Sequence, residues 1–596
     1  AHGPAILTAT LMNKPIWHAA WLRHRVALVL LFVVVLIIAS SVLPDPMHRA
    51  LGHPGNDVWN HVWGYWWVAS SFAEGRAPVS TTLLSWPAGG ALWFIDNFNA
   101  VLSLPVQVVL GPIAAYNAAV CFNIGLCGFG AYALAYRVTN NTWAALVAGL
   151  AYMTTPHLIS QIYNGVSEAV SAGWFPLAVL FLRETAHRPT RRNALLAGTF
   201  MGLTGLANWY YGLSAGIVAV ALLARAGWRW RRMPRWRRRN SEALGTAGVA
   251  VLLGGVTTGA ILLLPVLSFR ASLRAENALV SRNADFVWMS QIMHNMTDVI
   301  TLVHPGKFYS PDFRALQGED LIVVSYLGLS LVFVALWVIQ SVARPQARSW
   351  FALFGGFTML AVGPYLYVAG DYVTVDGGWV GLPFLALRQW IPAFSSISHA
   401  NRFVVGSALA LSVLAAIAVD TLSKRSALWA KLSPLLGVVV VLESLRGSPA
   451  VWPIPYASFS TPEVYARLTP GAVLDLPLCM PVLERSRLLA HQLVHKQPVP
   501  YGLNDPFPPF IRGNHFTKMV IALERWTVTY LPTEMPWIDL AAGEEQLWRL
   551  GMRHVVVDKQ AYTADQLSRV SRFLDLTLTP LHDDDRVRVY ALVEPS

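Results

Sequence analysis

Charged residues are scarce in this chain, and their scarcity excludes an ordinary soluble protein. Asp, Glu, Lys and Arg make up 13% of its 596 residues, whereas about 25% is typical of soluble domains. Hydrophobic residues make up 55%. The composition therefore predicts a membrane protein.

Cysteine is also rare. Cys121 and Cys127 lie in an apolar run and Cys479 stands alone, so neither a disulfide framework nor a Cys-x-x-Cys metal site is predicted. The sequence has no HExxH motif, no P-loop and no GxGxxG after a predicted strand. The absence of these motifs disfavours a nucleotide-driven pump and a soluble-type hydrolase.

The formal net charge of +12 raises the question of a nucleic-acid partner, so the positions of the basic residues matter. Many lie in short loops between apolar runs, where Lys and Arg mark the cytoplasmic side of a membrane protein. These loops are 23–25, 183–192, 229–239, 344–348 and 424–431. We therefore expect no nucleic-acid partner, and the WRWRRMPRWRRR run predicts a topology anchor that contacts anionic lipid.

Membrane spans were assigned from apolar runs of about 20 residues, with the basic loops fixing the side of each end. The predicted spans are about eleven: 26–43, 114–136, 141–155, 168–183, 193–207, 211–226, 244–266, 321–342, 349–369, 402–420 and 428–444. An odd number places the N-terminus inside and the C-terminus outside. The apolar stretch 100–112 is short and bounded by proline, which predicts an interfacial or re-entrant segment.

The predicted fold class is an α-helical polytopic membrane protein with a small C-terminal α/β extracytoplasmic domain. Residues 1–25 form a cytoplasmic segment, of which 1–11 do not look like a natural start and are left out of the fold argument. Residues 26–445 form the membrane domain, including a first outer loop at 44–99. Residues 446–596 form the outer domain, where GAVLDLPL, HVVVDK and RVRVYALV predict strands, and three amphipathic stretches predict helices.

The first outer loop holds the leading candidate, Asp57, four residues before His61 and surrounded by Trp and Tyr. Charged groups at membrane depth cost about 2.5–3.5 kcal/mol each, so they are functional candidates where they line a cavity. A carboxylate can act as general base and Arg or Lys can hold phosphate. The topology gathers these candidates on the outer side: Asp57, His61, Asp96, His157, Glu168, Tyr210, Tyr211, His304, Lys307, Arg388, His399 and Arg402.

Plainer interpretations stand beside each candidate. Asp57 fits a solvated acid on a surface amphipathic helix whose aromatic residues settle at the membrane interface. Arg388 and Arg402 fit cations that snorkel or pair with a structural acid. The tyrosines of NWYYG, at 208–212, fit interface anchors, and His157 and His304 fit ordinary loop histidines.

In its order of motifs the chain resembles the GT-C superfamily of polytopic glycosyltransferases, especially the bacterial YfhO-like type. The resemblance covers most of the chain. Its motifs are GND at Asp57, WFPL at 174–177, NWYYG, YLGLSL from Tyr326, LPFLALRQWIPAFSSISHANRF, and GAVLDLPL and LGMRHVVVDK in the outer domain.

The resemblance implies transfer of a sugar from a polyprenyl-phosphate carrier, with inversion, on the outer face of a bacterial inner membrane. It implies that Asp57 is the general base, in some relatives with a divalent cation (Mg or Mn), for which Asp57 and Asp96 are the residues at hand. Lys307, Arg388 and Arg402 are donor-phosphate candidates by position. The expected partners are the lipid-linked sugar, membrane lipid and a glycan, lipid or protein acceptor, with protein partners through the C-terminal domain.

The chain departs from the family pattern at one position. Many members have two adjacent acids in the first loop, whereas Asn56 precedes Asp57 here, which weakens the case for a metal. Two further hypotheses remain open: a non-catalytic membrane scaffold or accessory subunit that retains the fold, and a lipid or glycan transporter.

Overall fold

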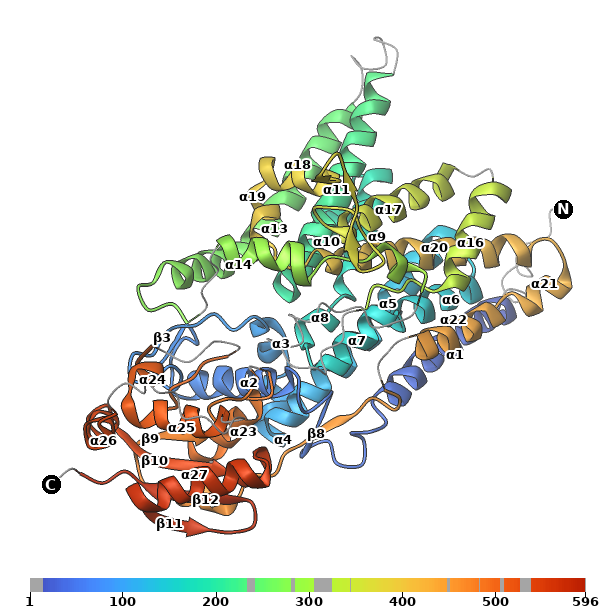
Figure 1. Cartoon of the computed structure of the whole chain (residues 1–596). Coiled ribbons are helices and arrows are strands. Elements are labelled where there is room, and N and C mark those ends of the chain that lie inside the picture. Colours follow the sequence, from blue (N-terminus) through green and yellow to red (C-terminus); the bar gives the residue numbers. More distant parts are fainter. Residues whose placement is uncertain are drawn as a thin grey trace, which may run out of the picture.

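The computed structural model describes residues 14–232, 242–279, 284–304, 324–342, 345–447, 451–481, 483–503, 509–525 and 538–594. The molecule is mostly helical, with one mixed sheet in its C-terminal region (Figure 1). Lys307 falls outside these residues, as does the rest of the HPGKFY motif beyond His304.

Every predicted span has a helix at its place in the described residues. These helices are α1 (Lys14–Ile38), α5 (Pro112–Thr139), α6 (Thr142–Met153), α9 (Trp174–His187), α10 (Arg191–Ala207), α11 (Trp209–Arg231), α13 (Glu242–Arg274), α16 (Leu329–Ser341), α17 (Pro345–Val362), α20 (Val404–Ser423) and α22 (Leu435–Gly447). Within the described residues five helical stretches are long and apolar enough to cross a membrane: 112–139, 209–229, 245–274, 400–423 and 427–446. The count of eleven crossings stays a prediction.

Polar caps and small residues explain where these helices begin and how closely they pack. The Asn141 side chain accepts hydrogen bonds from the first backbone amides of α6, and Thr190 does the same for α10. Gly198 of α10 lies so near the backbone of Gly254 in α13 that a Cβ at Gly198 would come within 2.4 Å of the Gly254 carbonyl oxygen. Close backbone approach through glycine is typical of helix packing in membranes.

The helix α20 forms the centre of the membrane domain. Its apolar window is entirely buried inside the protein, and α5, α6, α16 and α17 pack around it. The windows of α11 and α13 are mostly exposed, which suits helices that face lipid.

The first outer loop is folded rather than irregular. It contains β1 (Arg49–Leu51), α2 (Val58–Ala73) and the short hairpin β2 (Ser80–Thr81) and β3 (Gly90–Ala91). The stretch predicted not to span forms two short helices, α3 (Asn97–Leu102) and α4 (Leu104–Leu110).

Short elements fill other connections between the long helices. They are α7 (Pro156–Asn164), α8 (Ser167–Val170), α14 (Ala284–Met289), η1 (Ser290–His294), η2 (Val299–Leu302), β4 (Tyr367–Val368), β5 (Asp371–Tyr372), β6 (Thr374–Val375), β7 (Gly378–Trp379), α18 (Pro383–Trp390), α19 (Pro392–Ser396) and η3 (Ala400–Phe403). The predicted span 168–183 is therefore interrupted: its first residues belong to α8, and the long helix α9 begins at Trp174.

The C-terminal region forms a four-stranded sheet in the order β11-β12-β10-β9. Strands β9 (Ala472–Leu476) and β10 (Met552–Asp558) are parallel, and β12 (Val587–Ala591) is antiparallel to β10 and to β11 (Thr579–Asp583).

The remaining elements of the chain are α21 (Ala427–Leu432), β8 (Tyr456–Ser458), η4 (Glu463–Arg467), α23 (Ser486–His495), α24 (Pro509–Gly513), α25 (His515–Arg525), α26 (Leu540–Arg549), η5 (Lys559–Ala561) and α27 (Ala564–Thr577). The strands and helices predicted here are present, and β11 was not predicted.

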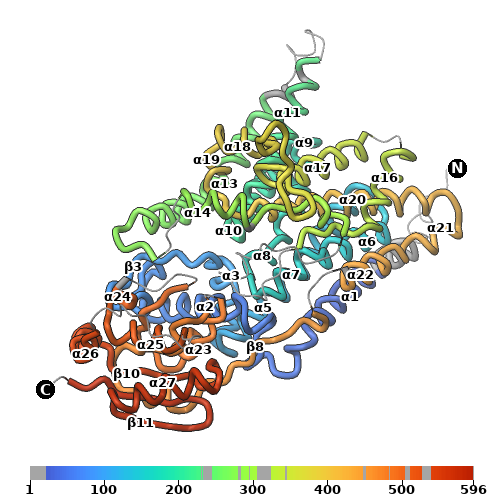
Figure 2. The backbone as a smooth tube through the Cα atoms, viewed as in Figure 1, coloured from blue at the N-terminus to red at the C-terminus, as the bar shows by residue number. Residues whose placement is uncertain are grey.

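This C-terminal region packs directly on the first outer loop, and Figure 2 shows the orange and red parts of the backbone tube beside the blue part. Strand β8 pairs antiparallel with β1, and α23 packs on α2. The buried Trp63 Nε1 donates to Gln492 Oε1 at 2.6 Å, and Ser486 Oγ donates to the Asn56 carbonyl oxygen at 3.0 Å. The residue next to Asp57 is therefore fixed by the C-terminal region.

We predict that Gln492→Leu destabilises the protein by about 1–3 kcal/mol, because it leaves the buried Trp63 indole N–H without this acceptor. The measurement is the thermal unfolding midpoint in detergent. The matched control is Gln560→Leu at an exposed position in the same region, which should leave the midpoint unchanged. Equal midpoints for Gln492→Leu and the parent would contradict the prediction.

Candidate functional site

The start of α2 is held against the end of α7. The Asp57 backbone N–H donates to the Asn164 carbonyl oxygen at 3.0 Å. Gly165, the residue that follows α7, has a φ of +77°, and a Cβ on it would lie 2.7 Å from the backbone nitrogen of Val58. Only glycine fits this close approach without strain. The local backbone therefore fixes Asp57 at the N-terminal end of α2, with His61 one turn later.

Helix α2 is enclosed by protein. Trp63, Tyr65 and Trp67 are fully buried and Asp57 is 9% exposed, while Trp66 is half-buried. The interpretation of this segment as a surface helix with a solvated acid and an interfacial aromatic belt is therefore wrong. The side chains of Trp59, Trp63, Tyr65 and Trp67 pack against other residues of the protein, whereas Phe72, near the end of the helix, is exposed.

His61 lies at the centre of a cluster of carboxylates. Its Nε2 is 3.5 Å from Glu168 Oε2 and 3.8 Å from Asp57 Oδ2. Its Nδ1 is 3.9 Å from Asp96 Oδ2 and 2.9 Å from Ser167 Oγ. Two segments of the first outer loop and the α8 segment thus meet at one imidazole.

Asp96 is the most deeply buried acid of the cluster. Tyr65 Oη donates to it at 3.0 Å and Asn99 Nδ2 at 2.6 Å, and Ser167 Oγ also donates to it. Ser167 accepts from a protonated His61 Nδ1 while donating to Asp96. The three side chains therefore form a continuous hydrogen-bonded path from the imidazole to the carboxylate.

Glu168 connects this cluster to the start of α20. Arg402, in η3, donates to Glu168 Oε1 at 3.1 Å, and its guanidinium lies 4.9 Å from the centre of the Tyr210 ring. Tyr210 Oη also lies 3.2 Å from His399 Nδ1. Five of the predicted site residues, Asp57, His61, Asp96, Glu168 and Arg402, are thus joined by ion pairs, with Tyr210 and His399 beside them.

The charge states of this cluster follow from burial and its neighbours. Burial opposes a charge on His61, but Asp57, Glu168 and Asp96 outweigh it and raise the pKa of His61 to about 9. Burial raises the pKa of Asp96 to about 7, although His61 opposes that shift. Near neutral pH the His61 imidazole is therefore protonated and Asp96 is partly protonated.

The other predicted residues lie apart from these ion pairs or have structural contacts. Tyr211 Oη donates to the Ala169 carbonyl oxygen at 2.5 Å, and His157 Nδ1 lies 3.0 Å from the Val324 carbonyl oxygen. Both are fully buried. Arg388 donates to Gln291 Oε1 at 3.0 Å and lies over the Trp288 ring. His304 is exposed, just after η2.

Sequence reasoning missed four polar partners of the two loop acids: Asn60, Tyr65, Asn99 and Ser167. For two of them a signal was present. Both acids begin an Asp-x-x-Asn pattern, Asp57 to Asn60 and Asp96 to Asn99, and in each case the Asn Nδ2 donates to the Asp carboxylate at 2.6 Å. A residue three positions on lies on the same side of the first helical turn.

The arrangement does not fit the divalent cation considered for Asp57 and Asp96. Their carboxylates approach opposite nitrogens of the His61 ring, which occupies the space between them. In the part of the chain that the structure describes, no group of three His, Cys, Asp or Glu side chains is arranged to hold a metal ion.

We predict that the stability of the protein falls as the pH rises through about 9, because the protonated His61 neutralises buried carboxylates. Since folding raises the pKa of His61 from 6.5, its contribution is fully present below pH 6.5 and is lost above 9. The measurement is the unfolding midpoint of the parent and of His61→Gln between pH 6 and 10. His61→Gln should be less stable at pH 6.5 and lack this step, whereas parallel profiles would contradict the assignment.

Known proteins resemble this chain in structure rather than in sequence. No protein-family model and no curated protein sequence matches it. The crystal structure of ArnT from Cupriavidus metallidurans bound to undecaprenyl phosphate superposes with a TM-score of 0.50 and 14% identity, covering 96% of this chain and 98% of that one. The mycobacterial arabinofuranosyltransferase AftD also gives 0.50 and 14%, covering 95% of this chain and 40% of that one. This chain therefore has the polytopic membrane fold of the GT-C glycosyltransferases.

Proposed function

We propose that the protein is an integral membrane glycosyltransferase that transfers a sugar from a polyprenyl-phosphate-linked donor to an acceptor, with Asp57 as general base. The GT-C fold supports the class of reaction, and one of the similar structures contains undecaprenyl phosphate. The buried cluster around His61 supports the position of the site. We further propose that the reaction takes place on the extracytoplasmic face of a bacterial inner membrane.

We assign the general base from the solvent exposure of the three acidic side chains in the cluster. The Asp57 side chain is 13% exposed, whereas the side chains of Asp96 and Glu168 are 0% and 5% exposed. Asp96 is also surrounded by donors, and Glu168 is paired with Arg402. Asp57 is therefore the carboxylate of this cluster that an acceptor hydroxyl can approach.

The proposed step is a single displacement. Asp57 takes the proton of the acceptor hydroxyl as the acceptor oxygen bonds to the anomeric carbon. The bond between that carbon and the donor phosphate oxygen breaks, and the phosphate leaves on its polyprenyl carrier. One accessible carboxylate supports this inverting route, because a retaining enzyme of the usual kind needs a second carboxylate as nucleophile.

His61 and Arg402 are proposed to supply the electrostatic part. The His61 imidazolium stabilises the ionised Asp57 before the proton arrives. Arg402 is the predicted phosphate-binding cation that lies in the cluster, and its planar guanidinium suits a phosphate. To bind one, it would share its donors between Glu168 and the phosphate. For Arg388 and Lys307 we propose a role in binding the donor phosphate only from their positions in the sequence.

We predict that Asp57→Asn lowers sugar transfer by about 10²–10⁴-fold, because the amide keeps the size of the side chain but cannot accept the proton. The measurement is the profile of glycans and lipid-linked saccharides in cells that lack the protein and express the parent or a variant at equal membrane abundance. The matched control is Asp45→Asn, an exposed acid of the same loop that contacts His48 outside the cluster.

The parent and Asp45→Asn should restore a missing sugar, and Asp57→Asn should leave the lipid-linked donor to accumulate. Restoration by all three proteins would contradict the role of Asp57. It would favour the non-catalytic scaffold, for which the buried ion pairs serve stability alone.

A further inference from the structure

A second charged feature lies at the opposite end of the membrane domain. A cavity of about 310 Å³ opens between α9, α11 and α17. Cationic side chains from two of these helices line it: Arg183 from α9, and Arg225 and Arg229 from α11. None of these residues belongs to the cluster around His61.

Among the described residues, the ion pairs at this cavity compensate only part of its cationic charge. Glu184 lies 3.4 Å from Arg183 Nη1 and 2.5 Å from Arg137 Nη2, so one carboxylate is shared by two guanidiniums. Arg225 Nη1 donates to Ser349 Oγ of α17 at 2.6 Å, which holds it over the cavity without neutralising it. Arg225 and Arg229 are both exposed. The cavity therefore attracts an anion.

The deeper wall of the cavity is apolar. It includes Val179 of α9, Val218 and Leu222 of α11, and Trp350 and Leu353 of α17. Val218 and Trp350 are buried. A free inorganic anion gains nothing from such a wall, whereas the glycerol backbone and upper acyl chains of a lipid bury apolar surface against it.

The position of the cavity matches the surface of a bilayer. On α11, Arg225 and Arg229 lie 14 and 18 residues beyond Tyr211, which is about 21–27 Å along a helix. Tyr211 contacts Ala169, the residue after Glu168, so it marks the end of α11 that lies beside the cluster. The distance from there to the two arginines is close to the thickness of a hydrocarbon core, about 30 Å. Helix α11 leads away from α2 toward that end of the molecule (Figure 1).

We propose that this cavity binds the phosphate headgroup of an anionic phospholipid, with Arg225 and Arg229 as the principal ligands and α9, α11 and α17 as its frame. Guanidiniums bind phosphate through paired N–H donors, and basic pockets between membrane helices bind anionic headgroups. The site is separate from the proposed transfer site and does not depend on it.

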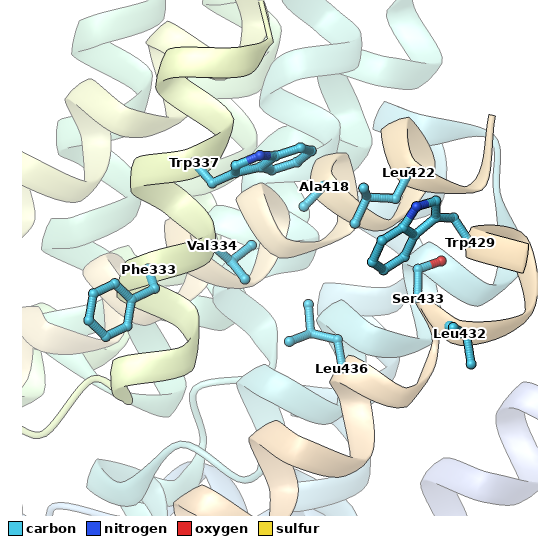
Figure 3. A pocket seen from close by; sticks show the side chains of 9 residues that line it. All are labelled: Phe333, Val334, Trp337, Ala418, Leu422, Trp429, Leu432, Ser433 and Leu436. Carbon is cyan, nitrogen blue, oxygen red and sulfur yellow. The ribbon is translucent and has the colours of Figure 1, made fainter. Parts of the chain in front are cut away.

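A second cavity provides the contrast. It has about 340 Å³ and lies between α16, α20, α21 and α22 (Figure 3). Phe333, Trp337, Trp429 and Leu436 are among its side chains, and no charged side chain is among those that line it in the described residues. Because this lining offers no cationic side chain for an anionic headgroup, we do not assign an anionic lipid to this cavity.

The test uses the full chain, purified and delipidated in neutral detergent. The probes are phosphatidylglycerol, phosphatidylcholine and inorganic phosphate, each added separately. The variants are Arg225→Gln with Arg229→Gln, and Arg348→Gln as the matched control, since Arg348 is an exposed arginine of α17 outside the cavity lining. The readouts are lipid retention in native mass spectrometry and the thermal unfolding midpoint.

We expect phosphatidylglycerol alone to be retained by the parent and to raise its midpoint by several degrees. Arg348→Gln should behave like the parent, whereas the double variant should lose at least half of both effects. Both substituted arginines are exposed, so the variant should fold. Equal effects of phosphatidylcholine, an equal effect of inorganic phosphate, or full retention by the double variant would overturn the proposal.

Discussion

The structure depends on burying the protonated His61 imidazole among three acidic side chains. Isolated charges are expensive to remove from water, and they are tolerated only where partners and hydrogen bonds surround them. Here the partners come from separated parts of the chain: Asp57 and Asp96 from the first outer loop, Glu168 from α8 and Arg402 from η3. Each segment is needed to satisfy the others.

That constraint explains why the elements around the cluster fit together so closely. The glycine at 165 lets α7 meet α2, and the break between α8 and α9 turns Glu168 inward instead of leaving it within a long span. The C-terminal region contacts the same loop through two elements: β8 pairs with β1, and α23 packs on α2. Asp57 therefore lies where the membrane helices and the C-terminal region meet, and this is where we propose that the lipid-linked donor meets its acceptor.

Much of this was predictable from the sequence, because apolar runs and basic loops follow simple physical rules. The helices at the predicted spans, the three strands β9, β10 and β12, and the grouping of Asp57 with Glu168 and Arg402 were expected from the sequence. Burial by protein could not be distinguished from burial by lipid, so the aromatic residues of α2 were assigned to the wrong environment. Ser167 gave no signal, because its role depends on a turn between two helices. Strand β11 is largely exposed and has little apolar alternation, so its pattern was too weak to predict.

We propose that the donor binds at the cluster around His61. The most direct measurement is a cryo-electron microscopy map of the protein in nanodiscs with undecaprenyl phosphate. We expect density for the phosphate beside Arg402, on the side that Asp57 faces, with the polyprenyl chain running along the membrane helices. Phosphate density remote from Asp57 and Arg402, with the ion pairs around His61 unchanged, would contradict it.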